Sequence, residues 1–168
     1  CFKDHPYVQQ CLSSPHLKKR WCKLSDFLRM HYLLVDGGIY LDADVEMLPN
    51  KNFDELLDAK MFVGQEQYAT PGSVLEPFYV PAVVGAEQGY PFVQRWMDEV
   101  VEKFRGDDDK NFESSMLLMT NRYVKESVGI SGMLALPADY FYPYCHEAGT
   151  VRITDRTICY HHFMKSWI

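Results

Sequence analysis

The sequence lacks any surplus of basic residues. Its 168 residues include 17 Lys and Arg against 23 Asp and Glu, a formal net charge of −6. A protein that follows a phosphate backbone needs clustered positive charge, so we expect no nucleic-acid partner. Internal repeats and low-complexity stretches are absent as well. The length and the ordinary globular composition therefore predict a single domain over residues 1–168.

Cysteine is present without the pattern of a disulfide scaffold or a zinc site. The five cysteines are odd in number and widely spaced, and they form no C-x-x-C pair. This usage favours buried thiols in a reducing cytoplasm. The sequence also has no apolar run of the roughly 18 residues that a membrane span needs, and no charged-then-apolar leader at its start.

Hydrophobic spacing predicts alternating helices and strands. Residues 18–36 carry apolar side chains at the three-and-four spacing of a helix, and Gly37 and Gly38 supply a left-handed end and a tight turn. Further helices are predicted from Pro91 and over 111–126, and residues 65–81 are predicted to form an ordered loop. The predicted strands are Ile39–Leu41, Met61–Gly64, Ala82–Ala86, Leu134–Leu136 and Thr157–Tyr160. This alternation predicts an α/β fold with a mainly parallel central sheet flanked by helices.

Two carboxylates stand where the first of these strands ends. Asp42 and Asp44, one residue apart, can point to one ligand when the backbone leaves the extended form. Carboxylate oxygens suit hard cations such as Mg²⁺ and Mn²⁺, and ligands bind at the carboxyl ends of strands in α/β sheets. An acidic pair at a strand end also caps turns or faces water, so this pair alone does not define a site.

Two other segments carry polar side chains, and each segment fits two interpretations. Asp26 and Arg29 lie three apart on one helix face, which fits a local ion pair or contacts with ribose hydroxyls and phosphate. Residues 160–167 gather imidazole, hydroxyl and indole groups near the end of the sequence. That segment is either a docked tail or a closing segment that supplies a metal ligand and a donor to phosphates.

Together these motifs resemble the DXD-containing glycosyltransferases of family 32. Residues 25–29 match the S-D-hydrophobic-hydrophobic-R pattern of that family, and residues 37–46 match its G-G-hydrophobic-Y-x-D-x-D-V-E core. The segments 139–143, 153–157 and 161–167 resemble the closing pattern of its capsular-polysaccharide branch. The family's opening strand has no counterpart before Cys1, so the expected fold is GT-A-like, lacking the first N-terminal strand, and the catalytic domain is expected to be N-terminally incomplete.

The resemblance implies a retaining glycosyltransferase that moves a hexose from a nucleotide-diphosphate sugar, with UDP favoured, to a saccharide or glycolipid acceptor, as in polysaccharide biosynthesis. It implies Mn²⁺ or Mg²⁺ as the cofactor, and a location in the cytoplasm, including the inner face of the membrane. The implied catalytic residues are Asp42 and Asp44. The implied metal ligands are Asp44, Asp42, His161 and Ser166, with His162 as an alternative to His161. The implied donor-binding residues are Asp26, Arg29, Tyr40, Asp42, Ser166 and Trp167.

No residue stands out as a catalytic base; Glu66 and Glu76 fit packing, loop or acceptor roles better. Two other functions remain open. One is a haloacid-dehalogenase-like phosphohydrolase with Asp42 as the nucleophile, although the acidic run Asp107–Asp109 follows a helix rather than the strand end that such enzymes use. The other is an inactive remnant that binds a carbohydrate or a nucleotide.

Overall fold

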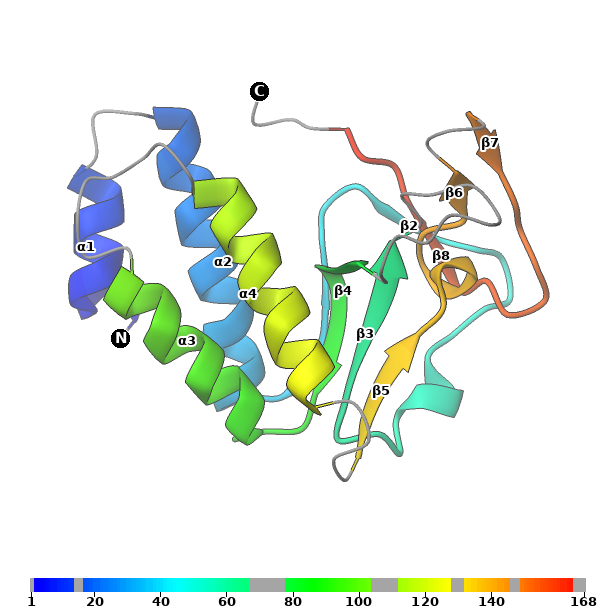
Figure 1. The fold of residues 1–168 in the computed structure, drawn as a ribbon, viewed down its shortest axis with the longest axis horizontal. Helices are drawn as coiled ribbons and strands as arrows, with labels where there is room; N and C mark the ends of the chain where they lie inside the picture. The colour runs from blue at the N-terminus through cyan, green and yellow to red at the C-terminus, as the bar shows by residue number, and fades with distance from the viewer. Residues whose placement is uncertain are drawn as a thin grey trace.

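The computed structural model describes residues 2–13, 17–66, 78–103, 112–127, 132–145 and 149–164. Its centre is a four-stranded sheet in the order β1-β4-β3-β5, made of β1 (Gly38–Leu41), β4 (Phe78–Ala86), β3 (Met61–Glu66) and β5 (Met133–Leu136). Two small antiparallel pairs join β2 (Val45–Met47) to β8 (Cys159–His161) and β6 (Tyr144–Cys145) to β7 (Thr150–Val151). The helices are α1 (Pro6–Ser13), α2 (Leu17–Val35), α3 (Pro91–Lys103) and α4 (Phe112–Ser127), which lie together on one side of the sheet (Figure 1).

The prediction of a mainly parallel sheet is wrong; the fold is mixed α/β. β4 runs antiparallel to both β1 and β3, and only β3 and β5 are parallel. Residues 67–77 are the whole connection from β3 to β4, shorter than the dozen or more residues of a typical parallel crossover. The connection from β3 to β5 contains α3 and α4, so that pair has the chain length to be parallel.

The local elements are confirmed, with shifted ends. The predicted helix 18–36 is α2, and the helices predicted from Pro91 and over 111–126 are α3 and α4. Each predicted strand lies within or overlaps an observed one. The prediction of a loop over 65–81 is wrong at both ends, where β3 includes residues 65–66 and β4 includes residues 78–81, and the remainder of that stretch lies outside the described residues.

The turn from α2 into β1 depends on its glycines. Gly37 and Gly38 have φ of 70° and 105°, in the left-handed range that other residues avoid. The Gly37 amide donates to Leu33 O at the helix end. A Cβ at Gly37 would lie 2.7 Å from the backbone nitrogen of Gln88. The turn therefore needs glycine for both backbone angle and space, and it sends the chain directly into β1.

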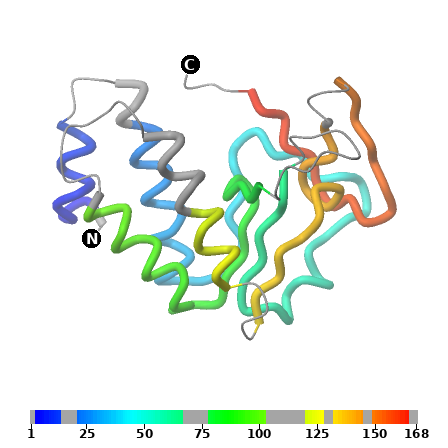
Figure 2. The backbone as a smooth tube through the Cα atoms, in the orientation of Figure 1, coloured from blue at the N-terminus to red at the C-terminus, as the bar shows by residue number. Residues whose placement is uncertain are grey.

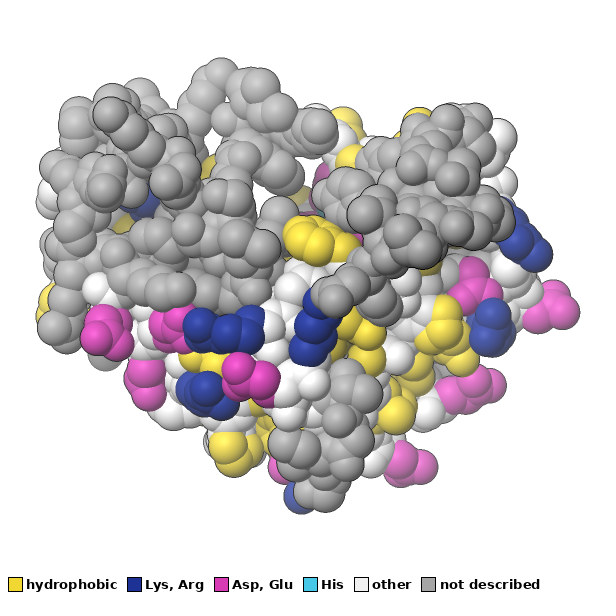
Figure 3. Space-filling view, viewed as in Figure 1, with side chains coloured by type: hydrophobic (Ala, Val, Ile, Leu, Met, Phe, Trp, Pro, Cys, Tyr) yellow, Lys and Arg dark blue, Asp and Glu magenta, His cyan; other side chains and the backbone are white. Residues whose placement is uncertain are grey.

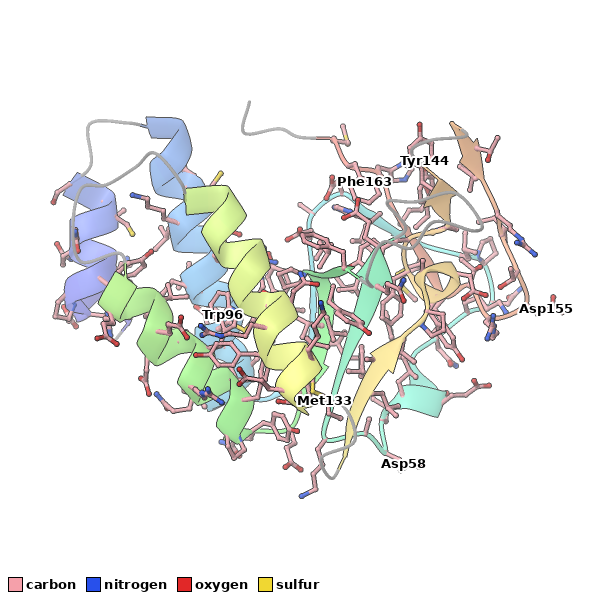
Figure 4. The ribbon with its side chains drawn as sticks, viewed as in Figure 1. Asp58, Trp96, Met133, Tyr144, Asp155 and Phe163 are labelled. Carbon is pink, nitrogen blue, oxygen red and sulfur yellow. The ribbon has the colours of Figure 1, made fainter. Side chains whose placement is uncertain are left out.

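Apolar side chains fill both faces of the sheet. On the helical face, Trp96 and Phe27 are fully buried with the sheet residue Val84, and the Trp96 indole donates to Thr120 Oγ1 at 3.2 Å. On the other face, Phe62 packs with Phe141, whose ring centroid is 6.0 Å away. Figure 4 shows the two regions, with Trp96 among the helices and Phe163 beside the small strands. The sheet is thus covered by packed side chains on both faces.

The surface over the helices carries mixed charge. Arg95 and Arg122 of α3 and α4 lie 3.1 and 3.9 Å from the carboxylate of Glu126. Figure 3 shows acidic and basic side chains next to one another in this region of the face drawn. Among the helices of the described ranges, none is both long enough and apolar enough to pass through a bilayer.

Candidate metal and donor site

The candidate site forms where the end of β1 meets β8. Asp42 and Asp44 follow β1, and the pairing of β2 with β8 places Val45 opposite His161. The His162 amide donates to Asp44 O at 3.0 Å, and the His161 amide donates to Phe141 O at 3.2 Å. The backbone tube in Figure 2 shows the late segment running beside the segment that follows β1. The fold therefore joins two predicted pieces of the site that are more than a hundred residues apart.

Three side chains converge at this junction. His161 Nε2 lies 3.1 Å from Asp44 Oδ1 and 3.9 Å from Asp42 Oδ2. One ligand atom from each of the three residues lies within 4.8 Å of the others. Adjacent ligands of an octahedral ion with bonds of about 2.1 Å are about 3 Å apart, and opposite ones about 4.2 Å. The three residues therefore have separations that suit a small divalent cation.

His161 is buried and directs Nε2 at the two aspartates. Its side chain is 5% exposed, Nε2 lies at ion-pair distance from Asp44 Oδ1, and Nδ1 makes no hydrogen bond with the described residues. Buried polar atoms are rarely left in this state. Burial lowers the pKa of His161 despite the Asp44 and Asp42 carboxylates, which raise it. The ring is therefore held in the neutral form that binds metals, and the donor set fits Mn²⁺ or Mg²⁺.

One oxygen of Asp42 is fixed by the protein, and the other faces the histidine. Oδ1 accepts from Arg29 Nη2 at 3.1 Å and from the Tyr40 hydroxyl at 2.8 Å. Oδ2 is the oxygen that faces His161. Fixing a ligand by hydrogen bonds to its second atom is how proteins orient metal-binding carboxylates.

A backbone amide holds Asp44 in the same manner. Its Oδ2 accepts the amide of Met164 at 2.9 Å, which leaves Oδ1 toward His161. The amide reaches Asp44 because Phe163 adopts φ of 52°, an uncommon left-handed conformation for an aromatic residue. Such backbone geometry is concentrated at functional sites. The turn after β8 therefore places the Met164 amide where it donates a hydrogen bond to Asp44.

Arg29 is at the centre of the buried polar network. Its Nη2 lies 3.1 Å from both Asp26 Oδ1 and Asp42 Oδ1, Nη1 donates to Pro81 O at 2.5 Å, and the guanidinium stacks 4.6 Å from the Tyr40 ring centroid. Burial lowers the pKa of Arg29, but the two carboxylates offset this and leave the pKa above its ordinary value. The ion pair with Asp26 is therefore present, and the donor contacts assigned to Asp26, Arg29 and Tyr40 stay predictions.

The remaining predicted residues lie apart or outside the described ranges. His162 pairs with Glu46, 2.8 Å from Nε2 to Oε2, rather than with the aspartates. Glu66 is buried at the end of β3. Ser166, Trp167, Glu76 and Asp107–Asp109 fall outside the residues that the structure describes.

Several contacts at this site could not be found from residue types. The partners of Arg29 and Asp44 include the Pro81 carbonyl and the Met164 amide, which are backbone groups. A motif search compares residue types, so it does not indicate contacts made by backbone atoms. Tyr142, whose ring meets the His161 ring edge-on at 5.8 Å, lies in the segment 139–143 that resembles the family's closing pattern, but the sequence indicated no role for it.

One comparison with known protein families covers the part of the chain that contains the two aspartates of the site. Residues 2–63, which contain Asp42 and Asp44, match the family described as "Glycosyltransferase sugar-binding region containing DXD motif". A comparison with curated protein sequences finds no match. A solved structure titled "PaToxG Glycosyltransferase" aligns with a TM-score of 0.41 and 18% identity, over 77% of this chain and 48% of that one. The chain thus spans about half the length of that protein.

Proposed function

We propose that this chain, which carries the DXD sugar-binding region of the glycosyltransferases over residues 2–63, is a metal-dependent retaining hexosyltransferase. Its donor is a nucleotide-diphosphate sugar, with UDP favoured, and its acceptor is a saccharide or glycolipid of polysaccharide biosynthesis. The proposal includes a GT-A-like single domain that acts in the cytoplasm, at the inner face of the membrane when the acceptor is a glycolipid. The resemblance to family 32 supports these finer assignments.

The observation that carries the proposal is the buried His161 Nε2, which faces the carboxylates of Asp44 and Asp42 at 3.1 and 3.9 Å. Asp42 and Asp44 belong to the matched DXD region, and His161 comes from a segment outside it. A metal-binding role accounts for the orientation of all three side chains.

The residues of the site have separable tasks in the proposed reaction. A divalent cation, when bound, neutralises the charge that develops on a departing nucleoside diphosphate. Asp42 and Asp44 supply anionic oxygens, and His161 supplies a neutral nitrogen. Arg29 and Tyr40 hold the Asp42 carboxylate in one orientation, so little reorganisation is needed when the donor binds.

The donor sugar and the acceptor stay predictions, as do the contacts of Ser166 and Trp167. Among the described residues, the sequence and the structure assign no carboxylate the role of a catalytic base. This is compatible with a retaining transfer in which the departing phosphate itself assists the acceptor. The family match favours a transferase over the haloacid-dehalogenase-like alternative, in which Asp42 would be the nucleophile.

The proposal is tested by hydrolysis and transfer with a panel of UDP- and GDP-hexoses in the presence and absence of Mn²⁺. We expect metal-dependent turnover that Asp44→Asn reduces at least a hundredfold, and an initial product whose anomeric configuration, read by NMR, equals that of the donor. Asp58→Asn, at an exposed aspartate, is the matched control. Donor binding without turnover would support the inactive remnant. Phosphate release from simple phosphate esters, lost in Asp42→Asn, would support the phosphohydrolase.

A further inference from the structure

A large irregularity in β4 lies directly beside the candidate site. The pairing of β3 with β4 shifts between Val63, opposite Val84, and Gly64, opposite Val80. Three residues of β4, from Pro81 to Val83, therefore have no partner on β3 and form a bulge. Bulges of this kind re-aim the backbone and are frequent next to active sites.

The hydroxyl of Tyr142 closes this bulge. It accepts the amide of Val83 at 3.0 Å and donates to Val80 O at 2.8 Å. The side chain is fully buried. Burial raises the pKa of Tyr142 well above its ordinary value, so the hydroxyl is protonated at neutral pH. The Tyr142 hydroxyl thus takes the place of β3 as the hydrogen-bond partner of this part of β4.

The bulged residues present backbone oxygens to the site. Pro81 O accepts from Arg29 Nη1 at 2.5 Å, and Ala82 O accepts the amide of Asp42 at 2.8 Å. Arg29 in turn donates to Asp42 Oδ1. The backbone and the side chain of Asp42 are therefore both anchored to the segment whose shape the Tyr142 hydroxyl fixes.

The ring of Tyr142 also contacts the third member of the site. It meets the His161 ring edge-on with centroids 5.8 Å apart, and the Phe163 ring at 6.2 Å. Space for the ring exists because position 64 is glycine. A Cβ there would lie 2.5 Å from Phe141 Cδ2 and 2.6 Å from Tyr142 Cε2. The same side chain therefore supports Asp42 through its hydroxyl and His161 through its ring.

We infer that Tyr142 is a positioning residue of the metal site, which fixes the β4 bulge so that Asp42 and His161 face one cation. This inference rests on the proposed function, because it assigns Tyr142 a role in the site where that function takes place. A phenylalanine would preserve the packing of the ring. It would remove the hydrogen-bond acceptor of the Val83 amide and release the bulge that holds Pro81 and Ala82.

The alternative role for Tyr142 is that of an ordinary core residue, and a second tyrosine provides the comparison. Tyr123 of α4 is also buried, its hydroxyl donates to Glu99, and it lies in the helical core. Tyr123→Phe removes one hydroxyl hydrogen bond away from the site. A purely structural role predicts that both variants lose stability and that neither changes metal binding.

The experiment measures Mn²⁺ affinity by isothermal titration calorimetry for the wild type, Tyr142→Phe and Tyr123→Phe, with amide hydrogen exchange read by NMR on the same proteins. We expect the Mn²⁺ dissociation constant to rise about tenfold in Tyr142→Phe and to stay within about twofold in Tyr123→Phe, since support groups of metal ligands typically contribute a factor of 10 to 100. The amides of Val83 and Asp42 should exchange faster in Tyr142→Phe only. If that variant does not fold, Gly64→Ala, which crowds the ring, should weaken Mn²⁺ binding in its place.

The outcomes separate the two proposals. Wild-type affinity and unchanged Val83 and Asp42 exchange in Tyr142→Phe, or in Gly64→Ala where that variant stands in, would overturn the inference and leave the proposed function intact. A wild-type protein that binds no Mn²⁺ would overturn the proposed function and the inference with it.

Discussion

Truncation of Arg29 should be among the most destabilising single changes that the site allows. The guanidinium is buried between Asp26 and Asp42, each 3.1 Å from Nη2, and it also binds Pro81 O. Arg29→Ala leaves two carboxylates close together with no cation. Removing one partner of a buried ion pair costs about 3–5 kcal/mol of unfolding free energy.

A solvent-exposed arginine supplies the contrast. Arg95 lies 3.1 Å from Glu126, but its side chain is 61% exposed. Exposed pairs of this kind contribute about 0–1 kcal/mol, because water screens the charges. Arg29→Lys should fall between the two, since it keeps the charge and loses the fork that reaches Pro81 O and the carboxylates together.

Urea unfolding followed by circular dichroism at pH 7.5 measures these differences directly. Arg29→Ala, Arg29→Lys and Arg95→Ala are compared with the wild type, along with Asp42→Asn and the double variant of Arg29→Ala with Asp42→Asn. The double variant should lose less than the sum of the two single losses, because each single change leaves the other group unpaired. An Arg29→Ala protein as stable as Arg95→Ala would refute the account of Arg29 as a buried centre.

Two further predictions concern backbone geometry and pH. Gly37→Ala should lower the free energy of unfolding by about 2 kcal/mol or more, because its Cβ meets the Gln88 nitrogen at 2.7 Å and φ is 70°. Gly149→Ala, with φ of 61° and open space around the Cβ, should lower it by about 1 kcal/mol. Equal losses of the two variants in urea unfolding would argue against the steric clash at Gly37. Burial raises the pKa of the Cys11 thiol above its ordinary value, so the folded state keeps a proton that the unfolded chain releases, and the free energy of unfolding should fall as pH rises past about 9. Cys11→Ala should show a shallower fall between pH 7.5 and 10, and parallel curves for the two proteins would exclude this source.

The local structure was largely predictable because its causes are local. The apolar stripe of α2, the glycines after it and the proline at the start of α3 each act within a few residues, and the structure has the elements where these signals stand. The direction of β4 was not predictable in this way. Strand direction depends on the length and path of a connection, and alternation of helices and strands elsewhere in the sequence favoured the wrong answer.

The candidate site was also predictable only in part. Asp42, Asp44 and His161 could be named from residue type and motif, and the structure brings all three together. Arg29 and Tyr40, which hold Asp42, were also named from the sequence. The supporting groups that the sequence did not indicate are a carbonyl at Pro81, an amide at Met164 and a phenol at Tyr142. Two of these are backbone atoms present at every residue, and the third is one of 11 tyrosines, so only the fold distinguishes them.

The most direct test of the central claim is the binding of Mn²⁺ to the purified protein at pH 7.5, followed by isothermal titration calorimetry. The account predicts one site per chain, with affinity reduced at least tenfold in Asp44→Asn and in His161→Ala and unchanged in Asp58→Asn. Equal binding by the wild type and His161→Ala would contradict the metal centre described here, because the buried histidine would then have no part in it.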